Sequence, residues 1–308
     1  MFAWVRRQLR RGYEQLLLRE LDETPSHVAI IQDGNRRYAR EQGGDAHDGH
    51  RAGAETTEQV LDWCEELDVD ELTLYAFSTE NFNRPEPERA RLFDLIESKL
   101  YDFADADRVH DAGVCIHAIG DIARLPEEVQ EAVRYAETQT REYDNFRLNI
   151  ALAYGGRNEL LRAARDVADA VDDGELDPED VGVATVEDRL YGRPVRDVDL
   201  IIRTGGDERT SNFLPWHANG NEAAVFFCAP YWPEFSKIDF LRGIRTYRSR
   251  EESWRQTRTK RAVALVRAVA SVELDEARAV AGRLRSQAPR SEAEEISEEL
   301  ARQERPAD

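Results

Sequence analysis

Four short stretches of the sequence combine glycines, hydroxyls, amides and arginines, and each directly follows an apolar run typical of a buried strand. They are residues 33–37 (DGNRR), 78–85 (STENFNRP), 154–158 (YGGRN) and 203–212 (RTGGDERTSN). Glycine lets backbone N–H groups approach an anion closely, and arginine binds phosphate oxygens through two parallel hydrogen bonds. In a chain with a net charge of -20, this concentration of arginine predicts a site for phosphorylated ligands.

Asp33 stands beside these arginines, where a carboxylate by itself would be a poor phosphate ligand. Mg²⁺ is bound by one or two carboxylates together with phosphate oxygens and water, so Asp33 is a candidate Mg²⁺ ligand. An isolated Asp-Gly pair after a strand more often forms a plain turn or a helix N-cap, but the arginines that follow favour metal binding. The sequence contains no GxxxxGK[ST], GxGxxG, GxSxG or HExxH motif, so those routes to nucleotide binding or hydrolysis find no support.

Alternating strands and helices must position these stretches. Near-continuous apolar, β-rich runs predict six strands, at 27–32, 71–77, 114–119, 147–153, 198–202 and 223–228. Helical stretches lie between them, for example at 53–67, 87–111, 126–143 and 158–172. This alternation predicts an α/β fold with a six-stranded, mostly parallel sheet flanked by helices. In such a sheet ligands bind at the carboxyl ends of the strands, and all four arginine-containing stretches follow strand ends.

The composition limits the partners and the compartment. The chain has 308 residues, with 62 acidic against 42 basic residues, and its few lysines are at 99, 237 and 260. This balance argues against nucleic acid, whose backbone needs a basic surface, and favours adaptation to high salt. Cys64, Cys115 and Cys228 lie far apart without metal-ligand spacing, which fits a reducing compartment. No apolar run approaches the ~20 residues of a membrane span and no signal peptide is apparent, so we expect a cytoplasmic protein.

The two ends of the chain differ from its centre. Residues 2–21 place apolar side chains at helical spacing with arginines on the other side. Such a helix either lies on an anionic membrane at its inner face or packs its apolar stripe on the domain, and the sequence leaves both open. From about 273 the chain is charged and poor in large apolar residues, which predicts a helix that frays into a disordered tail. We therefore expect an N-terminal amphipathic helix at 1–26, a catalytic domain at 27–250 and a helical, acidic C-terminal region at 251–308.

Six stretches resemble, in order, the motifs of the cis-prenyltransferases, whose type member is undecaprenyl diphosphate synthase. They are 27–39 (HVAIIQDGNRRYA), 49–53 (GHRAG), 72–85 (LTLYAFSTENFNRP), 149–157 (NIALAYGGR), 199–216 (DLIIRTGGDERTSNFLPW) and 231–235 (YWPEF). The resemblance runs from about 27 to 250. The NRRY form at 35–38 is similar to that of archaeal and eukaryotic members, which together with the acidic composition indicates an archaeal halophile.

The resemblance implies a Mg²⁺-dependent transferase. Members of the family elongate an allylic diphosphate by successive isopentenyl diphosphate units, and each new double bond is cis. For this chain the implied primer is geranylgeranyl or farnesyl diphosphate, and the archaeal features favour geranylgeranyl. The implied product is a long, undecaprenyl-type polyprenyl diphosphate, the precursor of a glycosyl carrier lipid, and the implied assembly is a homodimer. The hydrocarbon would need an apolar tunnel. The candidate lining residues are Trp63, Leu92, Phe93, Leu95, Ile96 and Leu100, each of which could instead be an ordinary core residue.

The resemblance also assigns Asp33 and Asn81 to catalysis. Asp33 would hold Mg²⁺ and assist the departure of diphosphate, whereas Asn81, too weak a base to act alone, would position the proton acceptor. Glu222 would be a second metal ligand, contributed in this family by the dimer partner. The implied substrate-binding residues are Gly34, Asn35, Arg36, Arg37, Tyr38 and His50 at the allylic diphosphate, Phe82 and Arg84 near the reacting units, Arg203, Arg209 and Ser211 at isopentenyl diphosphate, and also Ser78, Thr79, Glu80 and Thr210.

Three positions depart from the family pattern. Ala46 stands where members often have arginine, so one phosphate contact is missing or is supplied by His47. Arg36 replaces the glycine of bacterial members and would partly compensate. Glu208 stands where bacterial members often have histidine, which changes the charge beside Arg209.

An alternative is a non-catalytic subunit of a heteromeric cis-prenyltransferase, which only supports a catalytic partner. Such subunits have lost diphosphate-site residues, whereas Asp33, Asn81, Arg203, Arg209 and Glu222 are all present here. A diphosphate hydrolase would need a nucleophile or a further metal cluster, and trans-prenyl synthases carry DDxxD motifs in an all-α fold. The sequence therefore favours the synthase.

Overall fold

The computed structural model describes residues 2–191, 196–217 and 223–253. The chain divides into two compact units, Met1–Arg250 and Glu251–Asp308, and every named strand belongs to the first. The tail expected to be disordered from about 273 lies outside the described residues.

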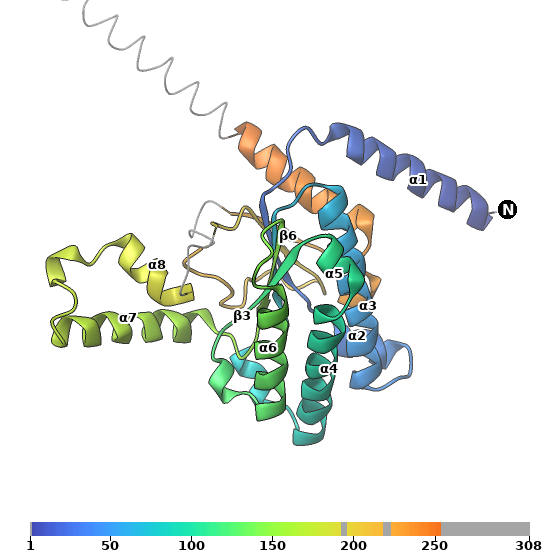
Figure 1. Ribbon diagram of the computed structural model, residues 1–308. Helices are drawn as coiled ribbons and strands as arrows, with labels where there is room; N and C mark the ends of the chain where they lie inside the picture. Colours follow the sequence, from blue (N-terminus) through green and yellow to red (C-terminus); the bar gives the residue numbers. More distant parts are fainter. Residues whose placement is uncertain (1, 192–195, 218–222, 254–308) are drawn as a thin grey trace, which may run out of the picture. The chain divides into compact units, whose positions relative to one another are not determined.

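Six strands and the helices between them build the first unit (Figure 1). The strands are β1 His27–Ile31, β2 Glu71–Tyr75, β3 Val114–Ile119, β4 Phe146–Ala151, β5 Leu200–Arg203 and β6 Ala224–Phe227. The α-helices are α1 Phe2–Glu20, α2 Asn35–Glu41, α3 Ala46–Glu66, α4 Glu86–Ala104, α5 Asp107–Asp111, α6 Glu127–Thr140, α7 Gly156–Asp172 and α8 Val183–Tyr191. The 3-10 helices are η1 Thr79–Asn83, η2 Ile122–Arg124, η3 Pro178–Asp180 and η4 Trp232–Glu234, and a further helix begins at residue 237.

The strands form one sheet in the order β3-β4-β2-β1-β5-β6, and every pairing is parallel. The predicted six-stranded sheet is therefore confirmed. At the carboxyl edge, Ile31 of β1 pairs with Tyr75 of β2 on one side and with Arg203 of β5 on the other. The segments that follow β1, β2 and β5 consequently meet at one place.

Helices cover both faces of the sheet, which explains why the strands are apolar at nearly every position. Val28 and Ile30 of β1 belong to one core, together with apolar residues of α3, α4 and α6. Ala29 and Ile31 point to the opposite core, which includes residues of α7 and α8. Figure 1 shows α4 and α6 running along one side of the sheet, with α7 and α8 on the other.

Two helices differ from the predicted ranges. The helix expected at 53–67 begins at Ala46, because the side chain of Asp45 accepts hydrogen bonds from the backbone amides of His47 (2.9 Å) and Asp48 (3.2 Å). The helix expected at 87–111 is divided into α4 and α5. Residues 35–41 form α2 and residues 183–191 form α8, and neither helix was among the predicted ranges.

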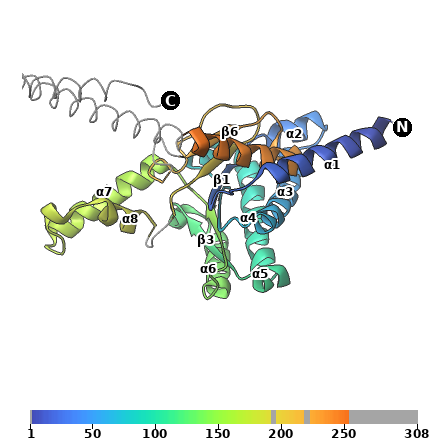
Figure 2. The same ribbon diagram turned by 90° about the horizontal axis from the view of Figure 1, so that it is seen from above.

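The N-terminal helix α1 packs on the rest of the first unit through its C-terminal half. Leu17 is buried in the core, and Glu14 pairs with Lys237 at 3.5 Å. Figure 2 shows α1 beside the helix that begins at 237. The side chains of Leu9, Tyr13 and Leu16 remain exposed. No helix within the described residues is both long enough and apolar enough to cross a membrane.

Buried polar side chains join β1, β2 and β4 near their amino ends. His27 Nε2 lies 2.8 Å from Thr73 Oγ1, and His27 Nδ1 lies 3.0 Å from the carbonyl oxygen of Arg196. Asn149 Nδ2 donates to Thr73 Oγ1 at 3.0 Å and to Glu71 Oε1 at 2.6 Å. Burial lowers the pKa of His27, so the ring is neutral and can donate to the Arg196 carbonyl while accepting from Thr73.

Candidate active site

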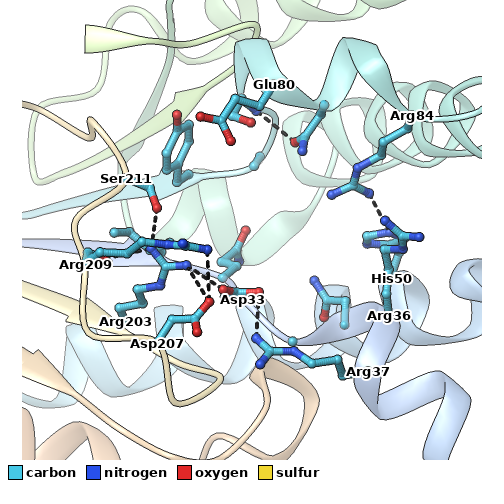
Figure 3. Close-up of a pocket in the computed structure, with 18 of the residues that line it drawn as sticks. Asp33, Arg36, Arg37, His50, Glu80, Arg84, Arg203, Asp207, Arg209 and Ser211 are labelled. Carbon is cyan, nitrogen blue, oxygen red and sulfur yellow. Dashed lines mark hydrogen bonds and ion pairs between the residues drawn. The ribbon is translucent and has the colours of Figure 1, made fainter. Parts of the chain in front are cut away.

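A cavity of about 510 Å³ opens at the carboxyl ends of β1, β2 and β5 (Figure 3). The sequence-predicted residues in its lining are Asp33, Gly34, Asn35, Arg36, Arg37, His50, Ser78, Glu80, Asn81, Arg84, Arg203, Arg209 and Ser211. These residues lie between Asp33 and Ser211, and the parallel sheet brings them together by aligning the strand ends. The position of the cavity agrees with the rule that ligands bind outside the carboxyl ends of parallel strands.

Two glycines let the backbone pass close to the cavity wall. Gly34 has a φ of 104°, and a Cβ atom there would lie 2.6 Å from Tyr231 Cδ1. Gly205 has a φ of 86°, and a Cβ atom there would lie 2.6 Å from Arg37 Nη2. Any other residue at either position would combine a strained left-handed backbone with a steric clash.

The carboxylate of Asp33 lies between two guanidinium groups. Its Oδ2 atom is 2.7 Å from Arg203 Nη2, and its Oδ1 atom is 3.1 Å from Arg37 Nη2. The side chain of Arg203 is only 4% exposed, whereas that of Asp33 is 30% exposed and faces the cavity. The metal candidate is therefore in place at the cavity surface, and both of its oxygens are held by cations.

Arg203 also organises the loop that follows β5. Its Nη1 atom donates to the carbonyl oxygen of Arg209 at 2.7 Å and to the hydroxyl of Ser211. Asp207 accepts from Arg203 Nη2 at 3.3 Å and pairs with Arg209 at 3.2 Å. The guanidinium group of Arg209 is 69% exposed, so it can turn toward an anion in the cavity.

A second group of cations lies on the opposite wall. Glu88 pairs with Arg36 at 3.4 Å and with Arg84 at 3.2 Å, and Arg84 Nη1 lies 3.2 Å from His50 Nε2. Burial, together with Arg84 and Arg36, lowers the pKa of His50 to about 4. His50 is therefore neutral near pH 7, and its Nε2 lone pair accepts a hydrogen bond that orients Arg84 (Figure 3).

Asn81 is fixed by the 3-10 helix η1. Its Oδ1 atom accepts a hydrogen bond from the backbone amide of Ser78 at 2.9 Å. Because this bond occupies the amide oxygen, the NH₂ group is the end of the side chain that remains for a ligand. Asn81 is thus arranged as a hydrogen-bond donor toward the cavity that it lines.

The charge of the lining favours an anionic ligand. Six arginines and three carboxylates line the cavity, in a chain whose formal charge is -20. A concave surface with excess positive charge concentrates anions, and arginine is suited to bidentate binding of phosphate oxygens. The geometry therefore fits a ligand with several phosphate oxygens.

Five predicted site residues are not in this lining. Thr79 lies against Gly155, where a Cβ atom would be 2.7 Å from its hydroxyl, and the ring of Phe82 packs at 5.0 Å from that of Phe77 with the guanidinium group of Arg124 above it. Tyr38 and Thr210 are half-buried elsewhere, and Glu222 lies outside the described residues. Substrate contact by these residues stays a prediction.

Sequence reasoning missed six residues of the cavity lining: Asp207 and Tyr75, which form contacts that shape the cavity, and also Ile31, Gln32, Arg40 and Ala76. Asp207 binds Arg203 and Arg209, and Tyr75 places its ring against Phe213 at 4.5 Å, with its hydroxyl donating to the Tyr154 carbonyl. Burial raises the pKa of Tyr75, so its phenol stays protonated. Asp207 lies in the stretch at 203–212 that the sequence singled out, and this position was the signal that could have identified it. Tyr75 falls within the predicted strand 71–77, whereas β2 ends at Tyr75 in the structure.

A smaller, apolar pocket of about 110 Å³ adjoins the cavity and shares Gln32, Asn35, His50 and Ala76 with it. Among the predicted tunnel residues, Leu92, Leu95, Ile96 and Leu100 of α4 line this pocket. Trp63 packs instead against Phe235, and Phe93 packs against Phe77. Residues of α3 complete the wall, so the pocket lies between α3 and α4.

The region of Ala46 contains a separate pocket. His47 and Arg91 line a space of about 210 Å³ beside α3, and His47 is not part of the arginine-lined cavity. Arg36 does line that cavity. Of the two residues considered as substitutes for the arginine missing at Ala46, Arg36 is therefore the one in position.

Comparison with known proteins identifies the family. Residues 31–255 match the prenyltransferase family model, which is described as "Putative undecaprenyl diphosphate synthase". This chain belongs to the cis-prenyltransferase family. Its relatives include proteins of Halobacterium salinarum (67% identical, covering 90% of this chain and 91% of the relative) and Haloarcula marismortui (63%, covering 94% and 95%). Both relatives are named tritrans,polycis-undecaprenyl-diphosphate synthase (geranylgeranyl-diphosphate specific).

Solved structures of the family share the fold. Lavandulyl diphosphate synthase from Lavandula x intermedia, in complex with dimethylallyl diphosphate, superposes with a TM-score of 0.67 at 33% identity, covering 73% of this chain and 95% of that one. A probable undecaprenyl diphosphate synthase from Campylobacter jejuni gives a TM-score of 0.59 at 30% identity, covering 74% and 96%. The enzyme is thus a cis-prenyltransferase with the fold of its family.

Proposed function

We propose that this chain condenses isopentenyl diphosphate repeatedly onto geranylgeranyl diphosphate and releases an undecaprenyl-type diphosphate with cis double bonds, the precursor of a glycosyl carrier lipid. The observation that carries the proposal is the arrangement of two arginine groups on opposite sides of Asp33, in a cavity that continues into an apolar pocket. Two diphosphates and one hydrocarbon chain are what such an arrangement can bind. The names of the halobacterial relatives support this primer and this product class.

The two arginine groups divide the substrates between them. Arg203, Arg209 and Ser211, with the loop after β5, would bind isopentenyl diphosphate. Arg37, with Arg36, Arg84 and His50 on the opposite wall, would bind the allylic diphosphate, whose hydrocarbon would enter the adjoining apolar pocket. Neutral His50 keeps Arg84 directed toward this subsite. Because His50 carries no positive charge itself, it does not add to the attraction that a departing diphosphate must overcome.

The residues present fit a Mg²⁺ ion held partly by substrate. The described residues contain no cluster of three or more His, Cys, Asp or Glu that could hold a metal alone, but Mg²⁺ requires only one or two carboxylates when phosphate oxygens complete its shell. Asp33 would be the ligand from this chain, and Glu222 of a second copy would be the other. When bound, Mg²⁺ supplies positive charge that stabilises the departing diphosphate.

The chain's own residues would then manage charge and proton transfer. Arg37 and Arg203 are already oriented before ionisation, so they stabilise the negative charge of the leaving diphosphate without reorganisation. Asn81 would donate its NH₂ group to a diphosphate oxygen, and that diphosphate or a water molecule would accept the proton lost from the new unit. Within this proposal Asn81 has a positioning role, which the hydrogen bond from the Ser78 amide to its Oδ1 atom supports.

Assembly and location are further parts of the proposal. We expect a homodimer, because the Glu222 assignment needs a second copy, and light scattering would test it. We also expect residues 27–250 to act as the catalytic domain in the cytoplasm, with residues 1–26 at the membrane surface. The exposed Leu9, Tyr13 and Leu16 support this location, and co-sedimentation with anionic vesicles would test it by comparison with a Leu9→Glu variant.

The decisive experiment supplies purified protein with Mg²⁺, labelled isopentenyl diphosphate and one of three primers: geranylgeranyl, farnesyl or dimethylallyl diphosphate. It is performed at low and high KCl, and the products are separated by chromatography. We expect elongation to long polyprenyl diphosphates, fastest with geranylgeranyl diphosphate. Absence of elongation with every primer at every salt concentration would refute the proposal and favour the non-catalytic subunit.

A further inference from the structure

Four residues line both the arginine-lined cavity and the apolar pocket, and together they are called the junction here. They are Gln32, Asn35, His50 and Ala76. Under the proposed function the primer has its diphosphate in the cavity and its hydrocarbon in the pocket, so the allylic carbons that connect the two lie at the junction. Ionisation makes these carbons positive, and a fixed partial negative charge beside them would stabilise the transition state.

Gln32 directs its side chain toward the side of the sheet on which the pocket lies. Val28 and Ile30 of β1 face the core that contains α3 and α4, and Gln32, which follows β1, continues this alternation. Its Nε2 atom donates to the hydroxyl oxygen of Thr57 on α3 at 2.8 Å. The next residue, Asp33, lines the cavity but not the pocket. The end of β1 therefore places an amide on the hydrocarbon side and a carboxylate on the diphosphate side.

The orientation of the Gln32 amide follows from the hydrogen bonds of Thr57. The Thr57 hydroxyl donates its one hydrogen to the carbonyl oxygen of Gly53 at 3.1 Å, so it can only accept from Gln32. The Gly53 carbonyl is held in turn by Nε1 of the buried Trp232, which donates to it at 2.7 Å. Because an acceptor needs an N–H opposite it, the NH₂ group of Gln32 faces Thr57 and its Oε1 atom faces away.

The Oε1 atom of Gln32 accepts no hydrogen bond from the part of the chain that the structure describes. The other members of the junction do not offer a comparable atom. Asn35 Oδ1 is buried against α3, where a Cβ atom at Gly53 would lie 2.4 Å from it. The Nε2 atom of neutral His50 already accepts a hydrogen bond, and Ala76 has no polar side-chain atom. Of these four side chains, Gln32 is thus the one whose acceptor is left for a ligand.

An amide oxygen with no donor suits an allylic cation. Placing an unpaired amide oxygen beside an apolar pocket costs free energy, so an apolar side chain of the same length would be the better choice for packing alone. The oxygen carries partial negative charge, but it is less nucleophilic than a carboxylate, which would combine with the cation to form an ester. The bond to Thr57 fixes the amide before ionisation, so no reorganisation is required during the reaction.

We propose that Gln32 is a catalytic residue whose Oε1 atom stabilises the allylic cation, and that Thr57 is the positioning residue that directs this atom. This inference rests on the proposed function and adds a residue to its ionisation step. In that step the C1–O bond of the primer breaks and its electron pair leaves with the diphosphate oxygen, so C1 and C3 share the positive charge. The terminal methylene carbon of isopentenyl diphosphate then bonds to C1 with its π electrons, and loss of a proton from the new unit restores a double bond.

Three variants and one matched control test the proposal. Gln32→Met keeps the length of the side chain and removes the oxygen. Thr57→Val keeps the shape of the side chain and removes the hydroxyl, so the amide can rotate, whereas Thr57→Ser keeps the hydroxyl. Gln130→Met is the control, because the Gln130 amide donates to the Leu125 carbonyl at 2.7 Å and lines neither the cavity nor the pocket.

Two unreactive ligands separate stabilisation of the cation from binding of the primer. The first is an ammonium analogue of the geranylgeranyl cation with a protonated nitrogen in place of C3, titrated by calorimetry with Mg²⁺ and inorganic diphosphate present. The second is geranylgeranyl thiolodiphosphate, whose C–S bond resists ionisation. A fixed amide dipole a few ångströms from a charge interacts with it appreciably at a protein surface, so Gln32→Met should weaken binding of the ammonium analogue by at least about fivefold. The affinity for the thiolodiphosphate should change less than about twofold.

The kinetic measurement is the single-turnover rate of the first condensation onto geranylgeranyl diphosphate. Gln32→Met should lower this rate by at least about fivefold, with KM for both substrates and the half-saturating Mg²⁺ concentration within about twofold of wild type. Thr57→Val should lower the rate by a smaller factor, about threefold, because the amide then points correctly only part of the time. Thr57→Ser and Gln130→Met should stay within about twofold, and thermal unfolding midpoints report whether each variant is folded.

Several results would overturn this inference. Equal weakening of both ligands by Gln32→Met would show that Gln32 binds the primer and not the cation, and a raised Mg²⁺ requirement would show that its oxygen binds the metal. A wild-type rate in Gln32→Met would overturn the inference and leave the proposed function intact, whereas no elongation by the wild-type enzyme would overturn both. If Gln32→Met does not fold, equal rates in Thr57→Val and Thr57→Ser overturn the inference.

Discussion

Replacement of Arg203 by lysine tests whether the buried guanidinium group organises the isopentenyl diphosphate subsite. Arg203 donates from two nitrogens on different sides: Nη2 contacts Asp33 and Asp207, and Nη1 contacts the Arg209 carbonyl and Ser211. Lysine keeps the positive charge but has a single nitrogen. It can keep the contact with Asp33 and at most one other, so at least two of the four contacts are lost.

The expected loss can be worked out from these contacts. A hydrogen bond that involves a charged group contributes about 1.5–3 kcal/mol, and two are lost. Asp33 and Asp207 are 30% and 40% exposed, so water compensates part of this. A net loss of about 2–3 kcal/mol in transition-state stabilisation corresponds to a decrease of roughly 30- to 150-fold in kcat/KM. The decrease should be larger for isopentenyl diphosphate than for the primer.

The measurement is a steady-state assay in which each substrate is varied at a saturating concentration of the other. Arg134→Lys is the control, because Arg134 forms an exposed pair with Glu127 on α6, far from the cavity, and should keep wild-type kinetics. Thermal unfolding reports whether the fold is preserved. A decrease of less than threefold in kcat/KM for isopentenyl diphosphate would refute the argument that the fork geometry of Arg203 organises this subsite.

Three further predictions follow from other contacts. Asp33→Ala should lower kcat by at least about 100-fold while circular dichroism remains that of the wild type, and near-normal turnover would refute the metal assignment. Gly205→Ala should raise KM for the allylic diphosphate more than Gly206→Ala does, because both glycines have a positive φ but only a Cβ at 205 collides with Arg37; equal KM values would contradict this. Burial lowers the pKa of His27, so the unfolded chain binds its proton more readily and the free energy of unfolding should fall as pH drops below 6.5, by at most about 1.4 kcal/mol per pH unit from this group. Denaturant titrations of wild type and His27→Gln should differ in this slope, and identical slopes would exclude His27.

The sequence was sufficient to predict the sheet and the position of the cavity. Strands covered on both faces are apolar at almost every position, so all six could be recognised without knowing their partners. Once they were placed in a parallel sheet, the segments at their carboxyl ends had to converge. This is why Asp33 and Arg203, 170 positions apart, could be assigned to one site before their 2.7 Å contact was known.

Features that depend on distant side chains could not be predicted. The low pKa of His50 requires burial and the approach of Arg84, 34 positions away. Phe82 lies within a site motif, but the turn of η1 directs its ring toward Phe77 in the core. The hydrogen bond that directs the Gln32 amide depends on how the end of β1 packs against α3, and sequence periodicity gives the buried face of a helix without specifying its neighbours.

The buried polar row at the amino ends of β1, β2 and β4 has a consequence for errors in strand alignment. Aliphatic strands can slide past one another by two residues and still bury apolar side chains, so hydrophobicity alone tolerates such errors. A slide would separate His27 from Thr73 and leave buried groups unpaired, at about 1–3 kcal/mol each. Strands are rigid, so the alignment set there is transmitted about 13 Å along β1 to the carboxyl edge, where Asp33 pairs with Arg203. Ligand affinity therefore depends on residues that never touch a ligand. Substitutions in this buried polar row should produce misfolded, inactive protein before they alter substrate specificity.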